Sequence, residues 1–185
     1  MASENVPIEQ FFSQQASGAL VEEANRFRAV PKDSYNVQIA KVDGKVWKAD
    51  DPEKRRNVAQ LTVNILKGDK KIATVWTNVS WEERRYKDGK LDMASRLWGQ
   101  LQKALFPTLS GADLAVKTVG DVIDAATRYP VGAYVGAGYK VPQPDNPQFT
   151  NVRTPRTPEE ETEYRTKGYK HVNEILSFSK HQEGR

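Results

Sequence analysis

The stretch AQLTVNILKGDKKIATVWTNVS, residues 59–80, decides the fold of this chain. Its first half alternates polar residues with the apolar residues Ala59, Leu61, Val63 and Ile65. That period of two is typical of a half-buried β-strand. A short turn at 67–70 contains Gly68, and a second extended run covers 72–79. Two such runs joined by a glycine-containing turn predict a β-hairpin.

Another strand is predicted before this hairpin. After a turn at 31–34, polar residues alternate with Tyr35, Val37 and Ile39. We expect this strand to reach Val42, to turn at Asp43-Gly44 and to resume at 46–47. The charged segment 49–57 contains Pro52, so it predicts a loop before the hairpin begins.

The hydrophobic period changes to that of a helix after the hairpin. Asp92 is a typical N-cap, and the following apolar residues fall on one helical face: Ala94, Leu97, Trp98, Leu101, Ala104 and Leu105. Pro107 follows the expected end of this helix. A shorter helix is predicted over 119–126, with Thr118 as its cap. Trp98 is expected in the core.

The C-terminal third is interpreted as two strands separated by a long loop. The first strand covers 129–141, and its glycines, Gly132, Gly136 and Gly138, indicate bulges, corners or close approach of another group. The segment 142–168 contains five prolines, which predict neither helix nor sheet in its first half. A helical turn is expected after Pro158, and the last strand covers 169–178.

The predicted order is three strands, two helices, a strand, a long loop and a last strand. This mainly β pattern, with a helix between strands three and four, matches the five-stranded, partly open OB-type barrel. A small strand-rich sandwich with inserted helices would give a similar pattern. The chain is divided into an N-terminal arm (1–28), one domain (29–180, including the loop 142–168) and a tail (181–185).

Composition limits the classes of protein to consider. The chain has 185 residues and a formal net charge of +4, from 28 basic and 24 acidic residues. This mild bias suits contact with a polyanion along one groove. There are no cysteines, which excludes disulfides and thiolate metal sites. No apolar run approaches the roughly 20 residues of a membrane helix, and the N-terminus lacks a signal-peptide pattern.

Aromatic and basic residues occur together at the end of the hairpin. Small apolar residues at 73, 75 and 79 share one parity, so Trp76 is expected on the opposite, outer face. It is followed by Trp81, Arg84, Arg85 and Tyr86. Aromatic faces beside cations are what single-stranded nucleic acid requires for base stacking and phosphate contact. The alternative is that Trp76 and Trp81 pack beneath the helix.

Two further groups extend this predicted site. Trp47 and Lys48, with Arg55 and Arg56, flank the first charged loop and lead into a strand with the polar outer face Gln60, Thr62 and Asn64. The second group consists of Tyr139, Lys140, Arg153 and Arg156, at the start of and within the long loop. For the first group the alternative is a solvated charged loop balanced by nearby acidic residues. For the second it is a disordered insertion whose charges largely cancel.

Enzymatic activity is not expected. The two histidines, His171 and His181, match no metal-ligand spacing. The chain contains no P-loop, and the glycines of VGAGYK lie in a predicted strand with no helix after it. We therefore expect no catalytic residue, no metal and no cofactor.

Three segments resemble phage-encoded single-stranded DNA-binding proteins of the OB type. They are AVPKDSYNVQIAKV (29–42), the hairpin quoted above, and KLDMASRLWGQLQKAL (90–105) followed by TVGDVIDAA (118–126). The resemblance covers roughly residues 29–178. It implies a protein that coats and protects single strands in phage DNA replication, recombination or repair, with little sequence preference, in the host cytoplasm.

The partners implied by this resemblance are single-stranded DNA or RNA, without a membrane. A homodimer or a cooperative assembly on the strand stays open. Replication proteins are further partners to consider, although the end KHQEGR lacks the acidic tail that recruits them in many such proteins. The alternative is a phage-encoded protein-interaction or structural module, in which exposed rings and arginines anchor a protein partner.

Overall fold

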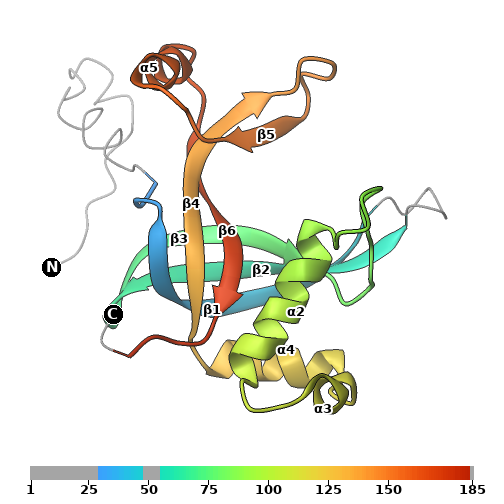
Figure 1. The fold of residues 1–185 in the computed structure, drawn as a ribbon. Coiled ribbons are helices and arrows are strands. Elements are labelled where there is room, and N and C mark those ends of the chain that lie inside the picture. The colour runs from blue at the N-terminus through green and yellow to red at the C-terminus, as the bar shows by residue number, and fades with distance from the viewer. Residues whose placement is uncertain (1–28, 48–54, 184–185) are drawn as a thin grey trace, which may run out of the picture.

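The computed structural model describes residues 29–47 and 55–183 (Figure 1). The predicted N-terminal arm (1–28), Lys48 and most of the charged loop lie outside the described residues. The described part is mainly β, as predicted. Its six antiparallel strands are β1 (Asp33–Trp47), β2 (Arg56–Lys67), β3 (Lys70–Val79), β4 (Val131–Pro142), β5 (Thr150–Arg153) and β6 (His171–Ser179).

Strands β2 and β3 form the predicted hairpin. They are joined by the two residues Gly68 and Asp69, and Gly68 has a φ of 58°, a conformation that side chains other than glycine disfavour. The alternating apolar residues of β2, from Ala59 to Ile65, are buried in the core.

Strand β1 is continuous, so the predicted turn at Asp43-Gly44 is wrong. Gly44 pairs with Ala59, and the strand continues to Trp47, which lies opposite Arg56. Long antiparallel pairing with β2 outweighs the local turn preference of the Asp-Gly pair. The register shifts by one residue at Ala40, and such a bulge bends and twists a strand.

The sheet is open between β3 and β6. Its strand order is β3-β2-β1-β4-β5, with β6 paired to β4. Successive antiparallel pairings make β3 and β6 run in the same direction, but within the described ranges they are not paired. The sixth strand, β5, was not predicted.

The glycines of β4 lie where neighbouring strands approach closely, as predicted. A Cβ atom at Gly132 would lie 2.4 Å from Ser179 Oγ. A Cβ atom at Gly138 would lie 2.8 Å from the Arg153 carbonyl oxygen. Larger residues at these positions would push β6 or β5 away from β4.

Both predicted helices are confirmed. In α2 (Met93–Leu105) the Asp92 side chain accepts a hydrogen bond from Ser95 N at 2.9 Å, as an N-cap. In α4 (Val119–Arg128) Thr118 and Asp121 form a capping box. A short helix, α3 (Gly111–Ala115), was not predicted, although Ser110 begins it with a capping box too.

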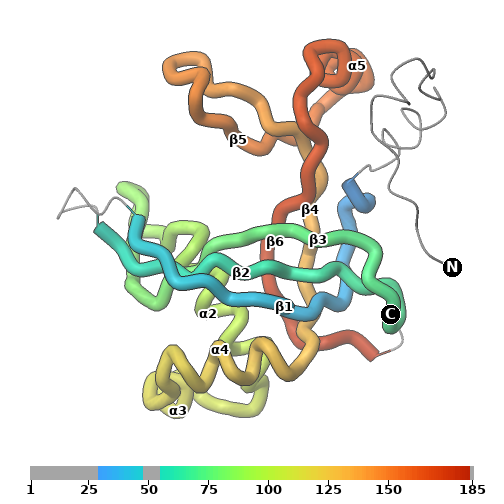
Figure 2. Tube along the Cα trace, turned by 180° about the vertical axis from the view of Figure 1, so that it is seen from behind, coloured from blue at the N-terminus to red at the C-terminus, as the bar shows by residue number. Residues whose placement is uncertain are grey.

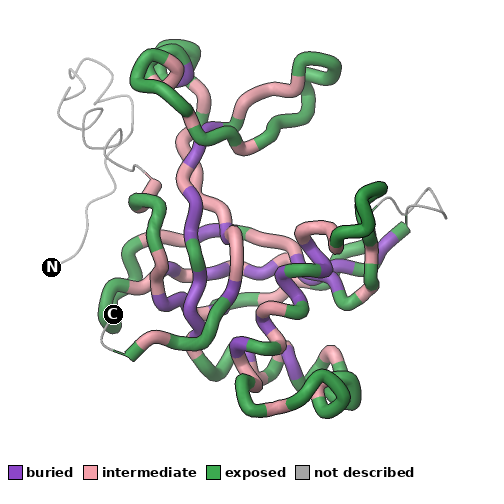
Figure 3. Tube along the Cα trace, viewed as in Figure 1, coloured by how far each residue is buried: buried purple, intermediate pink, exposed green. Residues whose placement is uncertain are grey.

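The core lies between the inner face of the strands and helices α2 and α4. Leu97, Trp98 and Leu101 from α2 join Val122 and Ala126 from α4 in one cluster with the inward residues of the strands. Trp98 is 7% exposed, which confirms its predicted core position. Figure 3 shows the buried positions concentrated along the central strands and the helix faces that meet them.

The proline-rich segment is more ordered than predicted. Strand β5 pairs with the end of β4, so the expectation of no sheet in its first half is wrong. Pro142 ends β4, where its missing N–H is tolerated. The helical turn predicted after Pro158 is a full helix, α5 (Pro158–Thr166), with Thr157 as N-cap. We call residues 142–168 the extension; it projects from the rest of the sheet (Figure 1).

The predicted tail is held to the sheet at Gln182. Gln182 N donates to Asn36 Oδ1 at 2.9 Å, and Asn36 Nδ2 donates to the Gln182 carbonyl oxygen at 2.7 Å. The last two residues of the chain lie outside the described ranges.

Candidate nucleic-acid interface

The outer face of the hairpin carries polar side chains in cross-strand rows. The pairs are Gln60–Asn78, Thr62–Trp76 and Asn64–Thr74. Strand β1 extends the row of Thr62 with Lys41 and the row of Gln60 with Asp43. Figure 2 shows β1, β2 and β3 from the side opposite α2, where no described helix crosses their central part. The predicted polar outer face is therefore present.

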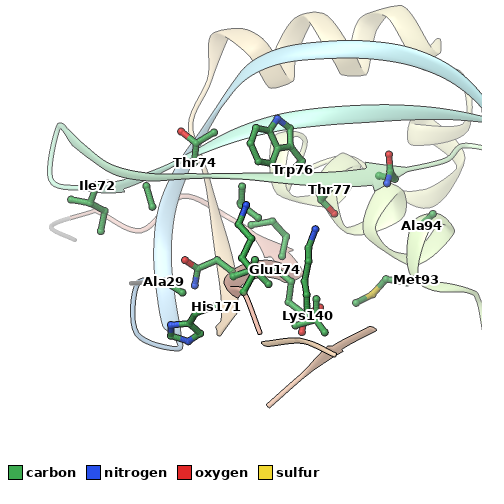
Figure 4. A pocket seen from close by; sticks show the side chains of 18 of the residues that line it. Ala29, Ile72, Thr74, Trp76, Thr77, Met93, Ala94, Lys140, His171 and Glu174 are labelled. Atoms are coloured by element: carbon green, nitrogen blue, oxygen red, sulfur yellow. The ribbon is translucent and has the colours of Figure 1, made fainter. Parts of the chain in front are cut away.

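Trp76 is the most exposed aromatic ring on this face. Its side chain is 65% exposed, so the alternative in which it packs beneath the helix is wrong. Figure 4 shows it on the same side of β3 as Thr74. Full burial of a large apolar side chain contributes about 1.5–3 kcal/mol. The isolated chain lacks most of that stabilisation at Trp76, which a ligand that covers the ring can supply.

A groove lies along the opening between β3 and β6 (Figure 4). Its volume is about 790 Å³, and its walls come from residues 71–78 of β3, 171–175 of β6 and the start of α2. Trp76 is among the lining residues, but its ring lies on the other side of β3 from Lys140 and Glu174 (Figure 4), so the groove and the outer face of the hairpin meet at the edge of β3. Lys140 lines the groove as well.

The first predicted aromatic and basic group is only partly on this surface. Trp47 ends β1, is 38% exposed and lines the groove. Arg55 is exposed at the start of the second described range, where its carbonyl accepts a hydrogen bond from Arg84 at 3.2 Å. Lys48 lies outside the described residues.

Arg56 is not on this surface, and its predicted contact with phosphate is wrong. Its side chain is 1% exposed. The guanidinium donates to Asp92, to Ser80 Oγ at 2.9 Å, to Ser95 Oγ at 2.6 Å and to the Glu82 carbonyl at 2.7 Å. A buried cation needs such partners, and these use its donors within the protein. Arg56 therefore fixes segment 80–95 against β2.

The segment after β3 is held by its own contacts. Trp81 packs edge-on against Trp98 with ring centroids 5.8 Å apart, and 37% of it remains exposed. The packing alternative is thus partly right for Trp81. Arg85 bonds Glu83 Oε1 at 2.6 Å and the Gly89 carbonyl at 2.8 Å. Tyr86 is 58% exposed, so of these three side chains its ring is the most accessible to a ligand.

Tyr139 is part of a small aromatic cluster at the base of the extension. It is 3% exposed, so its predicted direct contact with a ligand is wrong. Its ring stacks on His171 with centroids 4.6 Å apart and meets Tyr164 edge-on at 5.6 Å. Its hydroxyl accepts a hydrogen bond from Arg165 Nε at 3.1 Å. Tyr139 holds the extension to the sheet.

Arg153 and Arg156 lie together on the extension. Both are exposed and line a second cavity of about 500 Å³ with Thr154, Glu160 and Tyr164. Hydrogen bonds from the Tyr164 hydroxyl and the Arg156 backbone lower the pKa of Glu160. The cavity therefore contains an ionised acid as well as two cations.

Two lysines of the groove were missed by sequence reasoning. Lys71 and Lys170 are 99 positions apart in the sequence. They line the same groove because β3 and β6 face each other. A register shift in β3 places Lys71 opposite Leu66, on the same face as Trp76. Without that bulge, strict alternation would direct it to the other face. No local sequence pattern predicts this register shift.

Neither a metal site nor a membrane span is found in the described ranges. They contain no cluster of three or more His, Cys, Asp or Glu side chains arranged to bind a metal ion. Their helices are all too short or too polar to cross a bilayer.

Comparison of the chain with protein-family models, with curated proteins and with solved structures finds no match. Proposals about its function therefore depend on the residues and geometry described above and on the resemblance noted in the sequence.

Proposed function

We propose that this protein binds single-stranded nucleic acid, with single-stranded DNA as the ligand that the resemblance implies. The proposal includes an OB-type barrel formed by β1, β2, β3, β4 and β6, open between β3 and β6. It is supported by the position of α2 between β3 and β4 and by the pairing of β1 with both β2 and β4. On the same resemblance we propose a role in phage DNA replication, recombination or repair.

The observation that carries the proposal is Trp76 on the polar outer face of the hairpin. A ring that is 65% exposed amid Thr62, Thr74 and Asn78 has a free face for a nucleobase. Every base has a π-face, so stacking of this kind tolerates any sequence and contributes about 1–3 kcal/mol per base.

Cations around the face suit the phosphates of the same strand. Lys41 pairs with Thr62 in the row of Trp76, and Lys71 follows on the same face. Phosphate contacts of this kind release counterions and give affinity without reading sequence. A duplex would present these cations with phosphates but would keep its bases stacked away from Trp76.

Replacement of Trp76 tests the proposal. Trp76→Ala should weaken binding of an oligodeoxythymidylate about 5- to 150-fold, the equivalent of ~1–3 kcal/mol for one stacked base. Its melting temperature should stay near the wild-type value because the ring is mostly exposed. Affinity is measured by fluorescence anisotropy of a labelled oligonucleotide, so that loss of a tryptophan does not alter the signal.

Two control variants make the result specific. Tyr129→Ala removes another exposed ring, 62% accessible at the end of α4, and should leave binding unchanged. Trp98→Ala removes a core ring and should destabilise the fold by about 3–5 kcal/mol. If Trp76→Ala binds the oligonucleotide as tightly as Tyr129→Ala does, the stacking role is refuted.

A further inference from the structure

Three lysines from separate segments line the groove between β3 and β6. They are Lys71 in β3, Lys140 near the end of β4 and Lys170 just before β6, and all three are exposed. Lys140 N donates to the Lys170 carbonyl at 2.9 Å, so these two residues are neighbours on adjoining chain segments. Figure 4 shows the Lys140 side chain directed across the groove towards β3.

The positive charge of these lysines is not neutralised within the described ranges. The salt bridges found there join other residues and include none of the three lysines. Glu174 is the single acidic side chain among the lining residues. Its partial burial raises the pKa of its carboxyl, an effect that Lys32 partly offsets. Three lysines against one glutamate give the groove a net positive charge.

Asn78 also lines the groove, two residues after Trp76 on the same face of β3. Its Oδ1 atom is buried and has no hydrogen-bond donor among the described residues. A buried acceptor without a partner costs about 1–3 kcal/mol. Nucleobase edges carry N–H donors, whereas phosphates do not, so a base would satisfy this oxygen only if the side chain moved to expose it.

The distance between these groups requires more than one nucleotide. Lys71 and Trp76 pair with Leu66 and Thr62, which are four residues apart along β2, or about 13 Å at the usual rise of a strand. Lys140 and Lys170 lie on the opposite wall of the groove, next to the extension. A ligand that reaches Trp76 and all three lysines must therefore be a chain that crosses the edge of β3.

We propose that a single strand stacked on Trp76 continues over the edge of β3 into this groove, where its phosphates contact Lys71, Lys140 and Lys170. The inference rests on the proposed function and adds a path: the opening between β3 and β6 is the second half of the binding site.

The test compares oligonucleotides of two lengths. Lys140→Ala with Lys170→Ala is made in the full chain, and the matched control is Lys117→Ala with Lys180→Ala, two exposed lysines outside the groove. Binding of oligodeoxythymidylates of about four and about twelve nucleotides, both within the range of about 4–16 nucleotides for one OB fold, is measured at several salt concentrations.

The path predicts a loss that depends on length. The groove variant should bind the longer strand more weakly than the control does, and its salt slope should fall by about 1.4, from two lost phosphate contacts. Between 50 and 200 mM salt its affinity should then change about sevenfold less than that of the control. Binding of the shorter strand should be the same in both variants.

Other outcomes separate this inference from the proposed function. Equal affinity of the two variants for the longer strand overturns the path, and so does an equal loss at both lengths. In either case, wild-type binding that still depends on Trp76 leaves the proposed function standing. If the wild-type protein binds neither oligonucleotide, the proposed function and the path both fail.

Discussion

Among single side chains, the Arg56–Asp92 pair joins the hairpin to the start of α2. Partial burial raises the pKa of Asp92, but hydrogen bonds from Arg56 and Ser95 outweigh this effect and hold the pKa below its usual value. A carboxyl with a depressed pKa in the folded state contributes stability above its unfolded-state pKa, about 3.9. That contribution is lost as the pH falls through the folded-state pKa.

Asp92→Asn tests this linkage. Asparagine is as good an N-cap as aspartate, so α2 keeps its cap while buried Arg56 loses its counter-ion. The variant should have a lower free energy of unfolding than the wild type at pH 7. The difference should shrink as the pH drops below about 4, where the carboxyl of the unfolded wild-type chain takes up its proton, and should be lost once the folded-state carboxyl is protonated at lower pH. Denaturant unfolding at several pH values measures it; a difference that stays constant across that range contradicts the assignment.

Arg56 also shows what a sequence leaves undetermined at one position. It stands beside Arg55 in a basic run, and both were expected to contact phosphate. Arg56 is buried against three side-chain partners, Ser80, Asp92 and Ser95. These residues follow it by 24 to 39 positions. Strand parity, by contrast, is local, so the outward direction of Trp76 and the core position of Trp98 could be predicted.

Among the strands and helices, those with strong local signals were predictable. The hairpin has alternating residues and a glycine turn, and α2 and α4 have caps and apolar faces. The extension lacks such periodicity. Strand β5 forms because it pairs with the end of β4, and the cluster around Tyr139 exists only once α5 has folded back. These contacts link residues that are distant in the sequence, so local patterns do not predict them. The prolines of this segment also favoured a prediction without helix or sheet.

Shortening the extension tests whether it retains a bound strand. Replacing residues 142–168 with Asn-Gly joins Val141 to Tyr169 and keeps Lys140 and Lys170. The sheet should stay folded, because loop closure depends weakly on length. Dissociation of a labelled oligonucleotide should become several-fold faster. The variant lacks Arg153 and Arg156, and contacts that form after encounter affect mainly the dissociation rate.

Arg153→Ala with Arg156→Ala in the full-length chain is the matched comparison, because it removes the two charges and keeps the extension. Both variants should release the strand faster than the wild type. An unchanged dissociation rate in both, with the fold intact, would exclude Arg153 and Arg156 from the interface.

Across the protein as a whole, the proposed site exists only because the sheet is open. Residues from β3, the end of β4 and the start of β6 line one groove. Because these residues are far apart in the sequence, the groove could not be predicted from local patterns. The net charge of +4 is modest, and three of the lysines are gathered in the groove between β3 and β6. The proposed function therefore depends on where the charge lies more than on its total.

The proposed function predicts a preference for single strands over double strands. In the proposed site, Trp76 stacks only on an unpaired base with an exposed face. The lysines donate to phosphate oxygens of single or double strands alike. A protein-interaction module anchored by the same rings would bind neither form in a strongly salt-dependent way.

Competition between an oligonucleotide and its own duplex is the most direct measurement. A labelled single strand is bound to the wild-type protein at low and at moderate salt, and unlabelled single strand or duplex is added. We predict that the single strand displaces the label at much lower concentration than the duplex does, and that affinity falls steeply with salt. Displacement by the duplex at equal or lower concentration, or the absence of any binding at low salt, would contradict the proposed function.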